Sequence, residues 1–177
     1  IKVINLLGIK TKISKNICKI YGKGINGYNY KKNLTLDSKN SGTLGRLILG
    51  FLINTTYKIK IIGDKSLSKR DFKRISDPLS KFGAKFKLKQ NRNLPLKILG
   101  ISNPKPIKYY EKKGSAQCKS AVIFAGFRAN GTTTIKAKKS RNHTELLCKY
   151  LKLPISVKIR KNFDEIKIKK IKKITKI

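Results

Sequence analysis

The sequence predicts an α/β (α+β) fold built from repeated β-α-β-α-β-β units. Two observations lead to this prediction. Helical and extended apolar patterns alternate along the 177 residues, as they do in folds whose helices cover sheets. A helix end followed by a glycine and two strands also recurs, first at Gly8 and again 75 residues later at Gly83, with a looser copy that ends near Leu153. Glycine directly after a helix suits the left-handed position that ends many helices.

The predicted elements divide the chain into three units. The first unit, 1–33, is partial and holds only a helix end, a glycine turn and two short strands. In the second unit, 34–101, we expect strand 34–36, helix 41–53, strand 57–62, helix 69–82 and a strand pair near 84–86 and 96–100. In the third unit, 102–177, we expect helix 115–127, strand 132–137, helix 143–151 and strands 157–159 and 166–168.

The chain is strongly basic. It carries 44 Lys+Arg against 8 Asp+Glu, a net charge of +36, and such a charge is typical of nucleic-acid-binding proteins. Only 7 of the basic residues are arginine, which is the better residue for bidentate recognition of phosphates and bases. The lysines are spread along the chain, with one dense run over 166–177, and Lys, Ile and Asn all have A/T-rich codons. We therefore expect no specific nucleic-acid partner.

Composition also bounds the class of protein. Hydrophobic residues make up 39% of the chain, enough for a buried core. No apolar run approaches the roughly 20 residues that cross a bilayer, and no signal peptide opens the chain, so we expect no membrane partner and a cytoplasmic location. Cys18, Cys118 and Cys148 are too far apart for a disulfide framework or zinc site, and we expect no metal and no cofactor. The lack of methionine, with a helical pattern that already includes Ile1, leads us to expect a piece of a longer protein.

Residues 40–46, with the sequence NSGTLGR, open an amphipathic helix whose apolar face continues to Leu52. The first turn of a helix leaves backbone N–H groups unpaired and carries the positive end of the helix dipole. Gly42 lets an anion approach this backbone closely. The segment therefore predicts a seat for a phosphate or a carboxylate, although the same pattern also serves simple capping.

Residues 63–71, with the sequence GDKSLSKRD, follow a strand and open the helix expected over 69–82. Ser68 and Asp71 form an S-x-x-D capping pattern. This pattern places Arg70 in the first helical turn, where a guanidinium can fork onto a carboxylate or a phosphate. The alternative is that Lys69 and Arg70 are a solvated basic pair.

Residues 114–120, with the sequence GSAQCKS, open a helix of small residues. Ser115 is a suitable N-cap residue. Gln117 follows in the first turn, where its amide offers both a donor and an acceptor to a ligand. This segment is the third candidate ligand-binding helix start.

Residues 140–145, with the sequence SRNHTE, open the last helix. Asn142 and Glu145 fit a capping box. Ser140 and Arg141 precede the helix, where an anion would lie. We assign His143, the only histidine, a structural role, because no carboxylate partner is evident in the sequence nearby.

Together the four segments resemble the family of 5-enolpyruvylshikimate-3-phosphate synthase (3-phosphoshikimate 1-carboxyvinyltransferase). The motifs N-S-G-T-x-x-R, G-D-x-S-L-S-x-R, S-A-Q-x-K-S-A and S-R-x-H-T-E occur in the order and spacing of that family. The resemblance implies six β-α-β-α-β-β units in two domains, and identifies 1–177 as an incomplete N-terminal domain. It implies transfer of the enolpyruvyl group of phosphoenolpyruvate to the 5-hydroxyl of shikimate 3-phosphate, on the route to chorismate and the aromatic amino acids.

The resemblance also implies two sets of binding residues. The phosphoenolpyruvate set is Asn40, Gly42, Arg70 and Gln117. The shikimate 3-phosphate set is Ser115, Ala116, Gln117, Ser140 and Arg141. Arg46 is expected to orient the first loop. The acid–base residues of the family match no position in this chain, so we expect none of the catalytic residues here, an inactive isolated chain, and a monomer at full length.

Two alternatives stay open at this point. A basic nucleic-acid-binding module on a related fold would bind with a steep salt dependence. The product of a truncated or decayed gene from an A/T-rich genome would have no activity.

Overall fold

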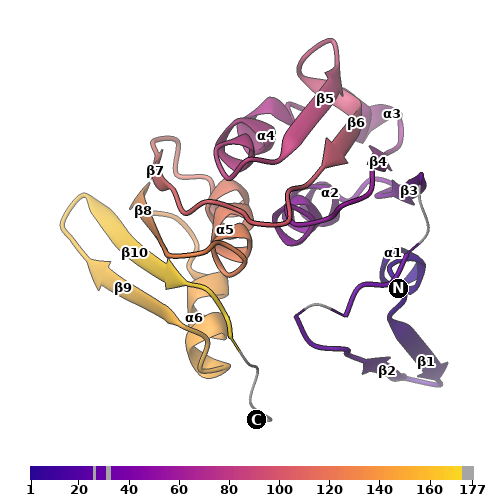
Figure 1. Ribbon diagram of the computed structural model, residues 1–177, viewed down its shortest axis with the longest axis horizontal. Coiled ribbons are helices and arrows are strands. Elements are labelled where there is room, and N and C mark those ends of the chain that lie inside the picture. Colours follow the sequence, from indigo (N-terminus) through magenta and orange to yellow (C-terminus); the bar gives the residue numbers. More distant parts are fainter. Residues whose placement is uncertain (26, 31–32, 173–177) are drawn as a thin grey trace.

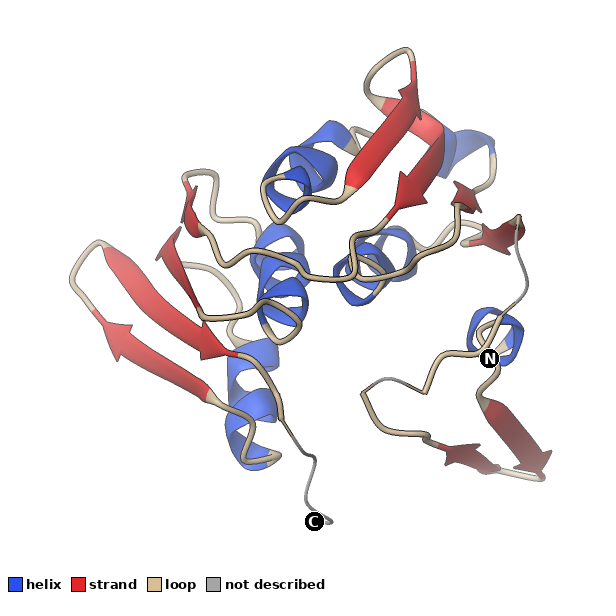
Figure 2. Ribbon diagram, viewed as in Figure 1, coloured by secondary structure: helices blue, strands red, loops and turns tan. Residues whose placement is uncertain are grey.

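The computed structural model describes residues 1–25, 27–30 and 33–172. Two four-stranded sheets lie around a central pair of helices, and one two-stranded sheet lies apart from this pair, near the N-terminus, as Figures 1 and 2 show. The first unit contains α1 (Lys2–Leu6), β1 (Lys10–Ser14) and β2 (Ile17–Tyr21). The two strands pair with each other in antiparallel fashion.

The second and third units contain the same elements, except that α3 has no counterpart. The second unit holds β3 (Leu34–Asp37), α2 (Gly42–Phe51), β4 (Ile59–Ile62), α3 (Lys65–Ser68), α4 (Lys73–Ser80), β5 (Lys85–Lys89) and β6 (Asn93–Leu99). The third unit holds β7 (Lys108–Glu111), α5 (Ala116–Gly126), β8 (Thr132–Lys138), α6 (His143–Tyr150), β9 (Ile155–Ile159) and β10 (Phe163–Lys169).

The strand order confirms the predicted repeat. One sheet has the order β3-β4-β6-β5 and the other β7-β8-β10-β9. In each sheet the first two strands are parallel and joined by a helix, while the last two strands form an antiparallel pair. By position in the repeat, β1 and β2 correspond to this last pair.

Alternation along the strands explains which face of each sheet is buried. In β6, Leu94, Leu96 and Ile98 are buried and the residues between them are exposed. Successive side chains of a strand point to opposite faces, so one face of the sheet packs on the helices and the other meets solvent. Ile166 and Ile168 repeat this pattern in β10.

The central helices α2 and α5 pack closely because glycine removes a side chain at their contact. A Cβ atom at Gly50 would lie 2.3 Å from the backbone oxygen of Ala121 on α5. One residue further along, the rings of Phe51 and Phe124 stack with their centroids 4.2 Å apart. Gly45, also inside α2, leaves room for the Phe72 ring, which lies 3.3 Å from the position of a Cβ atom. The glycines of α2 therefore serve packing, although glycine inside a helix costs about 1 kcal/mol relative to alanine.

The predicted helix ends are confirmed in their backbone geometry. Gly8 and Gly83 adopt positive φ angles of 83° and 107°. In the third unit, which has no glycine at the corresponding point, Lys152 takes the left-handed conformation with φ of 50°. The loss of glycine explains why this copy of the repeat is the least evident in the sequence.

Two regions differ from the prediction. The helix expected over 69–82 begins only at Lys73, where the Asp71 carboxylate accepts from the Lys73 N–H. Residues 65–68, capped by Asp64, form a separate short helix, α3, which was not predicted. The strand β7 was not predicted. Its sequence, KYYE, is short, and its single fully buried residue is Glu111, so it lacks the apolar alternation that identifies a strand.

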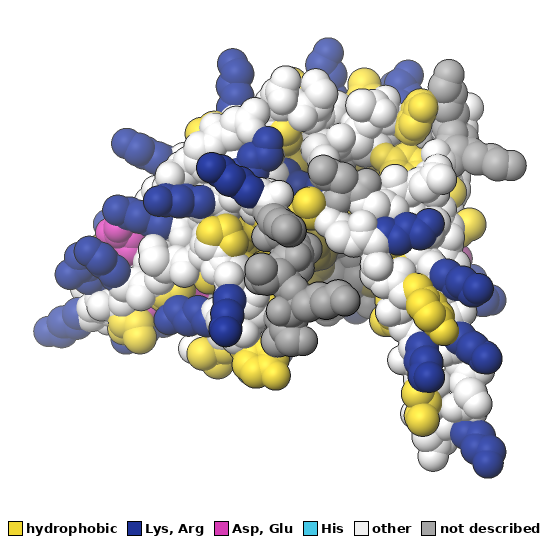
Figure 3. Space-filling model, turned by 60° about the horizontal axis from the view of Figure 1, so that its bottom comes forward, with side chains coloured by type: hydrophobic (Ala, Val, Ile, Leu, Met, Phe, Trp, Pro, Cys, Tyr) yellow, Lys and Arg dark blue, Asp and Glu magenta, His cyan; other side chains and the backbone are white. Residues whose placement is uncertain are grey.

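Basic side chains are spread over the surface. On the face in Figure 3, lysine and arginine side chains lie over most of the outline, and acidic side chains are few. The positive charge on this face is distributed and does not gather in one patch. The last five residues of the predicted basic run, 173–177, lie outside the described residues.

Candidate functional site

The four predicted helix starts converge on one end of the central helix pair. The position of a Cβ atom at Gly42, in the first turn of α2, is 3.1 Å from Nη1 of Arg70. Gln117, in the first turn of α5, donates a hydrogen bond to Oγ1 of Thr43 on α2. The loop that precedes α6 joins them, because Lys119 of α5 donates to the carbonyl oxygen of Arg141. Residues from sequence segments 100 positions apart thus form one surface.

The loop before α2 is fixed by the segment that follows β4. The Asn40 side-chain amide donates to Oδ2 of Asp64 at 2.5 Å, and the Asp64 backbone N–H donates to the carbonyl oxygen of Lys39. Ser41 caps α2 by accepting from the Leu44 N–H at 3.1 Å. Gly42 is buried in this loop, which brings the unpaired N–H groups of the helix start close to Arg70.

Asp64 has a structural role in this loop. It caps α3 by accepting from the Leu67 N–H at 2.7 Å. This bond first, and the Asn40 amide next, lower the pKa of the Asp64 carboxyl below its usual value. The carboxylate is therefore ionised at neutral pH and committed to hydrogen bonds of the loop.

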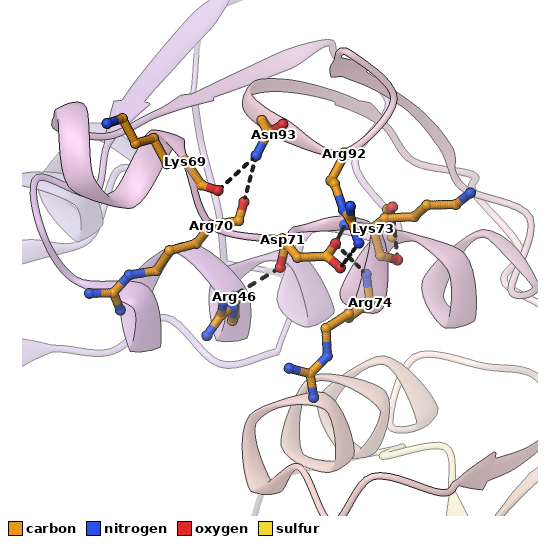
Figure 4. A network of polar contacts seen from close by, with 9 residues as sticks. Arg46, Lys69, Arg70, Asp71, Lys73, Arg74, Arg92 and Asn93 are labelled. Atoms are coloured by element: carbon orange, nitrogen blue, oxygen red, sulfur yellow. Dashed lines mark hydrogen bonds and ion pairs between the residues drawn. The ribbon is translucent and has the colours of Figure 1, made fainter.

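Arg70 lies between α3 and α4, and not in a first helical turn as predicted. The S-x-x-D interpretation of Ser68 was wrong, because its hydroxyl donates to the Gly63 carbonyl oxygen at 3.1 Å and Ser68 ends α3. The Asn93 amide donates to the carbonyl oxygens of Lys69 and Arg70 at 3.0 and 3.2 Å. These bonds hold the Arg70 backbone from the neighbouring strand, as Figure 4 shows.

The Arg70 side chain extends away from the network around Asp71 (Figure 4). Asp71 accepts from the Lys73 N–H at 2.9 Å and pairs with Arg92 at 3.3 Å, so its carboxylate is engaged at the start of α4. In the described part of the chain the Arg70 guanidinium has no hydrogen-bond acceptor or ion-pair partner. Arg70 is exposed and therefore available to an anionic ligand.

Arg46 joins the two central helices. We expected it to orient its own loop, but its guanidinium donates to Oε1 of Gln117 at 2.6 Å and to the Asp71 carbonyl oxygen at 3.4 Å. It also lies over the Phe72 ring, 5.5 Å from the ring centroid. Burial lowers the pKa of Arg46, and the nearby charges of Arg74 and Arg70 act in the same direction. Arg70 and Arg74 therefore add positive potential at Arg46, which favours binding of an anion beside these residues.

The start of α5 is held by a carboxylate that sequence reasoning did not single out. Glu111, buried at the end of β7, accepts from the backbone N–H groups of Lys113 at 3.2 Å and Ser115 at 2.8 Å. Ser115 caps α5 by accepting from the Cys118 N–H at 3.3 Å, as predicted. Ala116 and Gln117 begin the helix and are half-buried.

The loop of Ser140 and Arg141 lies beside the α5 start. A Cβ atom at Gly114 would be 3.2 Å from the Lys139 carbonyl oxygen, so the two loops are in contact. Oγ of Ser140 is buried and has no hydrogen-bond partner among the described residues, while the Arg141 side chain is exposed. The Ser140 hydroxyl therefore has unused hydrogen-bonding capacity below the surface, and the Arg141 side chain is accessible to a ligand.

The predicted capping box at α6 was wrong. The Asn142 side chain makes no capping hydrogen bond, and Glu145 is turned into the interior, where Oε1 lies 2.6 Å from Nζ of Lys119. Lys119 and Glu145 are both buried. A fully buried lysine paired with a carboxylate 26 positions away cannot be recognised from local sequence pattern, which explains why the pair was missed. His143 opens α6 and is exposed.

Other kinds of site are not evident in the part of the chain that the structure describes. No group of three or more His, Cys, Asp or Glu residues there has the geometry to hold a metal ion. No helix there is both long and apolar enough to cross a membrane. A hollow lined by Tyr28, Tyr30, Tyr57 and Arg128 also includes Phe51, the last residue of α2, and so lies at the opposite end of that helix from Gly42.

Comparison with known proteins finds similar sequences and similar structures. The sequence model of the family described as EPSP synthase (3-phosphoshikimate 1-carboxyvinyltransferase) matches residues 1–176. A 3-phosphoshikimate 1-carboxyvinyltransferase from Streptococcus agalactiae is 44% identical over 147 residues, covering 82% of this chain and 34% of that protein. One from Clostridium tetani is 36% identical over 159 residues, covering 89% of this chain and 36% of that protein.

Solved structures show the same similarity. An EPSP synthase from Acinetobacter baumannii superposes with a TM-score of 0.86 at 31% sequence identity, covering 98% of this chain and 38% of that one. The chain spans about a third of the length of the curated relatives that it matches.

Proposed function

Because the chain belongs to the EPSP synthase (3-phosphoshikimate 1-carboxyvinyltransferase) family, we propose that it supplies one wall of the active site of an enolpyruvyl transferase. The full-length protein would transfer the enolpyruvyl group of phosphoenolpyruvate to the 5-hydroxyl of shikimate 3-phosphate. The products are 5-enolpyruvylshikimate 3-phosphate and phosphate, on the route to chorismate. The proposal includes a monomeric, cytoplasmic enzyme that needs no cofactor.

One observation carries the proposal. The starts of α2 and α5, each of which holds part of one predicted set of binding residues, are joined by the 2.6 Å hydrogen bond from Arg46 to Gln117. Two anionic substrates that react with each other need adjacent binding groups, because holding reactants side by side removes much of the entropic barrier. The starts of α2 and α5 are in contact, so one anion bound at each start would lie beside the other.

The phosphoenolpyruvate side consists of Asn40, Gly42, Arg70 and Gln117. The exposed guanidinium of Arg70 beside the first turn of α2 combines a fixed positive charge with unpaired backbone N–H groups. Both features favour a phosphate. Asn40 uses one amide hydrogen for Asp64 and retains a second for a ligand.

The shikimate 3-phosphate side consists of Ser115, Ala116, Gln117, Ser140 and Arg141. The unpartnered hydroxyl of Ser140 and the exposed side chain of Arg141 support their assignment to the 3-phosphate. Gln117 lies between the two sides, since its amide contacts α2 through both Arg46 and Thr43. Its remaining donor and acceptor capacity would face both substrates.

In this proposal the chain binds and orients substrates, and the proton transfers belong to residues elsewhere in the protein. The 5-hydroxyl oxygen adds to C2 of phosphoenolpyruvate and loses its proton to a base, while C3 gains a proton from an acid, which gives a tetrahedral intermediate. Loss of phosphate from C2 and of a proton from C3 then restores the double bond. The arginines would stabilise negative charge on the phosphate groups during both steps.

The test is a coupled assay on the full-length protein. Phosphate release should require both phosphoenolpyruvate and shikimate 3-phosphate, and the organic product should gain the mass of one enolpyruvyl group. Phosphate release with phosphoenolpyruvate alone, or tight salt-sensitive binding of RNA without turnover, would refute the proposal.

A further inference from the structure

We propose that Lys119 is a positioning residue, which holds the backbone of the Ser140–Arg141 loop in the geometry that receives a phosphate group. The inference rests on the proposed function, since it concerns the shikimate 3-phosphate side of the site. Lys119 itself does not reach the surface. Its side chain is 1% exposed, and that of its partner Glu145 is 4% exposed.

The Lys119 side chain connects α5 to α6 and to the loop that precedes α6. Nζ lies 2.6 Å from Oε1 of Glu145 on α6 and donates to the carbonyl oxygen of Arg141 at 3.0 Å. The first backbone hydrogen bond of α6 runs from the Leu146 N–H to the carbonyl oxygen of Asn142. The Arg141 carbonyl lies one residue before this bond. The helix therefore does not fix the Arg141 peptide, and Lys119 supplies its hydrogen bond.

Local capping does not replace this contact. The Asn142 side chain makes no capping hydrogen bond to α6, although asparagine is among the preferred N-cap residues. The start of α6 is instead joined to α5 by Lys119 and by the hydroxyl contact between Ser120 and Thr144, 2.7 Å apart. Of these two contacts, that of Lys119 includes the Arg141 backbone.

A buried ion pair is not by itself a device for stability. Replacing such a pair by apolar residues of similar volume is often neutral or stabilising, whereas removal of one partner leaves an uncompensated charge. The pair at Lys119 also leaves Oε2 of Glu145 without a hydrogen-bond partner among the described residues. What the lysine adds beyond apolar packing is the directed hydrogen bond to the loop.

This difference gives an experiment on the full-length protein. The variant Lys119→Met/Glu145→Leu removes both charges and the bond to Arg141 while keeping apolar volume. The matched control Ser120→Ala/Thr144→Val removes the neighbouring contact between α5 and α6 but keeps the bond to Arg141. Dissociation constants for shikimate 3-phosphate and for shikimate are measured by calorimetry, and the KM for phosphoenolpyruvate by phosphate release.

We expect the Lys119→Met/Glu145→Leu variant to bind shikimate 3-phosphate at least tenfold more weakly than the wild type. Its affinity for shikimate and its KM for phosphoenolpyruvate should stay within about threefold of the wild-type values. The control should stay within threefold for all three. A folded Met/Leu variant with wild-type affinity for shikimate 3-phosphate would overturn the inference, and so would an equal loss for every ligand.

If the Met/Leu variant does not fold, the reverse pair Lys119→Leu/Glu145→Met is measured in its place. Its outcomes are judged in the same way. A wild-type protein that binds neither substrate would instead overturn the proposed function, so that the two failures are distinguishable.

Discussion

The guanidinium of Arg46 and the side-chain amide of Gln117, 71 positions apart in the sequence, form a hydrogen bond of 2.6 Å between α2 and α5. The same amide donates to Oγ1 of Thr43 at 3.0 Å. Because its oxygen faces Arg46 and its nitrogen faces Thr43, the orientation of the amide is defined. The glutamine that we propose to contact both substrates is thereby held at a fixed angle.

We predict that Arg46→Met impairs catalysis without removing a substrate contact. Methionine keeps apolar volume beside Phe72 but cannot donate to Gln117, so the amide is free to rotate. A misplacement of about 1 Å costs about 10²-fold in rate, and we expect a loss of that order in kcat/KM of the full-length enzyme. Steady-state phosphate release measures it.

Arg92→Ala is the matched control for this prediction. Arg92 also contacts Asp71, but its side chain is 65% exposed and the ion pair spans 3.3 Å. Surface ion pairs contribute about 0–1 kcal/mol, so activity should stay near that of the wild type. An Arg46→Met enzyme as active as Arg92→Ala would show that the hydrogen bond to Gln117 has no role in the reaction.

We also predict that the two exposed arginines act on different substrates. Arg70→Ala should raise the KM for phosphoenolpyruvate, and Arg141→Ala should raise the dissociation constant for shikimate 3-phosphate. Hydrogen bonds to charged groups contribute about 1.5–3 kcal/mol, which corresponds to roughly tenfold or more for each. Phosphate release measures the KM for phosphoenolpyruvate, and calorimetry measures the dissociation constant for shikimate 3-phosphate. An equal effect of both variants on shikimate 3-phosphate would contradict the division.

Much of the fold was predictable because its signals are local. Helix periodicity over 41–53 and glycine at Gly8 and Gly83 identify elements and their ends without knowledge of the tertiary structure. β7 was missed because it lacks apolar alternation. The helix expected over 69–82 was predicted to begin too early, because Ser68 ends α3 and Asp71 accepts from the first N–H group of α4 at Lys73.

The site was predictable only in part, for a related reason. Helix starts such as the one at Ser115 are marked by neighbouring residues in the sequence. The contacts that join these starts are not, because Arg46 to Gln117 and Lys119 to Glu145 depend on how distant helices pack. Local pattern therefore predicts where the helix starts lie, but it does not predict the long-range contacts that hold them together.

The isolated 177-residue chain should show no turnover. Three carboxylates near the site accept from backbone N–H groups, Asp64 at the start of α3, Asp71 at the start of α4 and Glu111 at the start of α5. General acid–base chemistry needs a group that exchanges a proton with substrate, and none of these three is placed to do so. Phosphate release by the purified chain with both substrates present, above that of a buffer blank, would contradict this prediction.

Stability should fall with alkaline pH through Cys148. Burial first, and the charge of Glu145 next, raise the pKa of this thiol from 9.0 to about 11. Between pH 9 and 11 the unfolded state loses the thiol proton while the folded state keeps it, so the free energy of unfolding decreases as pH rises. The slope has an upper limit of about 1.4 kcal/mol per pH unit for one proton.

Urea denaturation of the wild type and of Cys148→Ala at several pH values isolates this contribution. The variant is expected to be less stable throughout, because it leaves a small cavity, but its stability should depend less steeply on pH above 9. Parallel curves for the two proteins would exclude Cys148 as the source of the slope.

The packing of α2 on α5 predicts an unusual sign for a glycine substitution. In most helix interiors Gly→Ala stabilises by about 1 kcal/mol. At Gly50, however, the new Cβ would lie 2.3 Å from the Ala121 backbone oxygen, and neither backbone can move without separating the central helices. Overpacking typically costs about 1–3 kcal/mol, so Gly50→Ala should lower the free energy of unfolding.

Gly22→Ala is the control, because no atom lies within 4 Å of the added Cβ there, and its denaturation midpoint should match that of the wild type. A Gly50→Ala protein as stable as Gly22→Ala would mean that α2 and α5 are further apart in solution than this geometry requires.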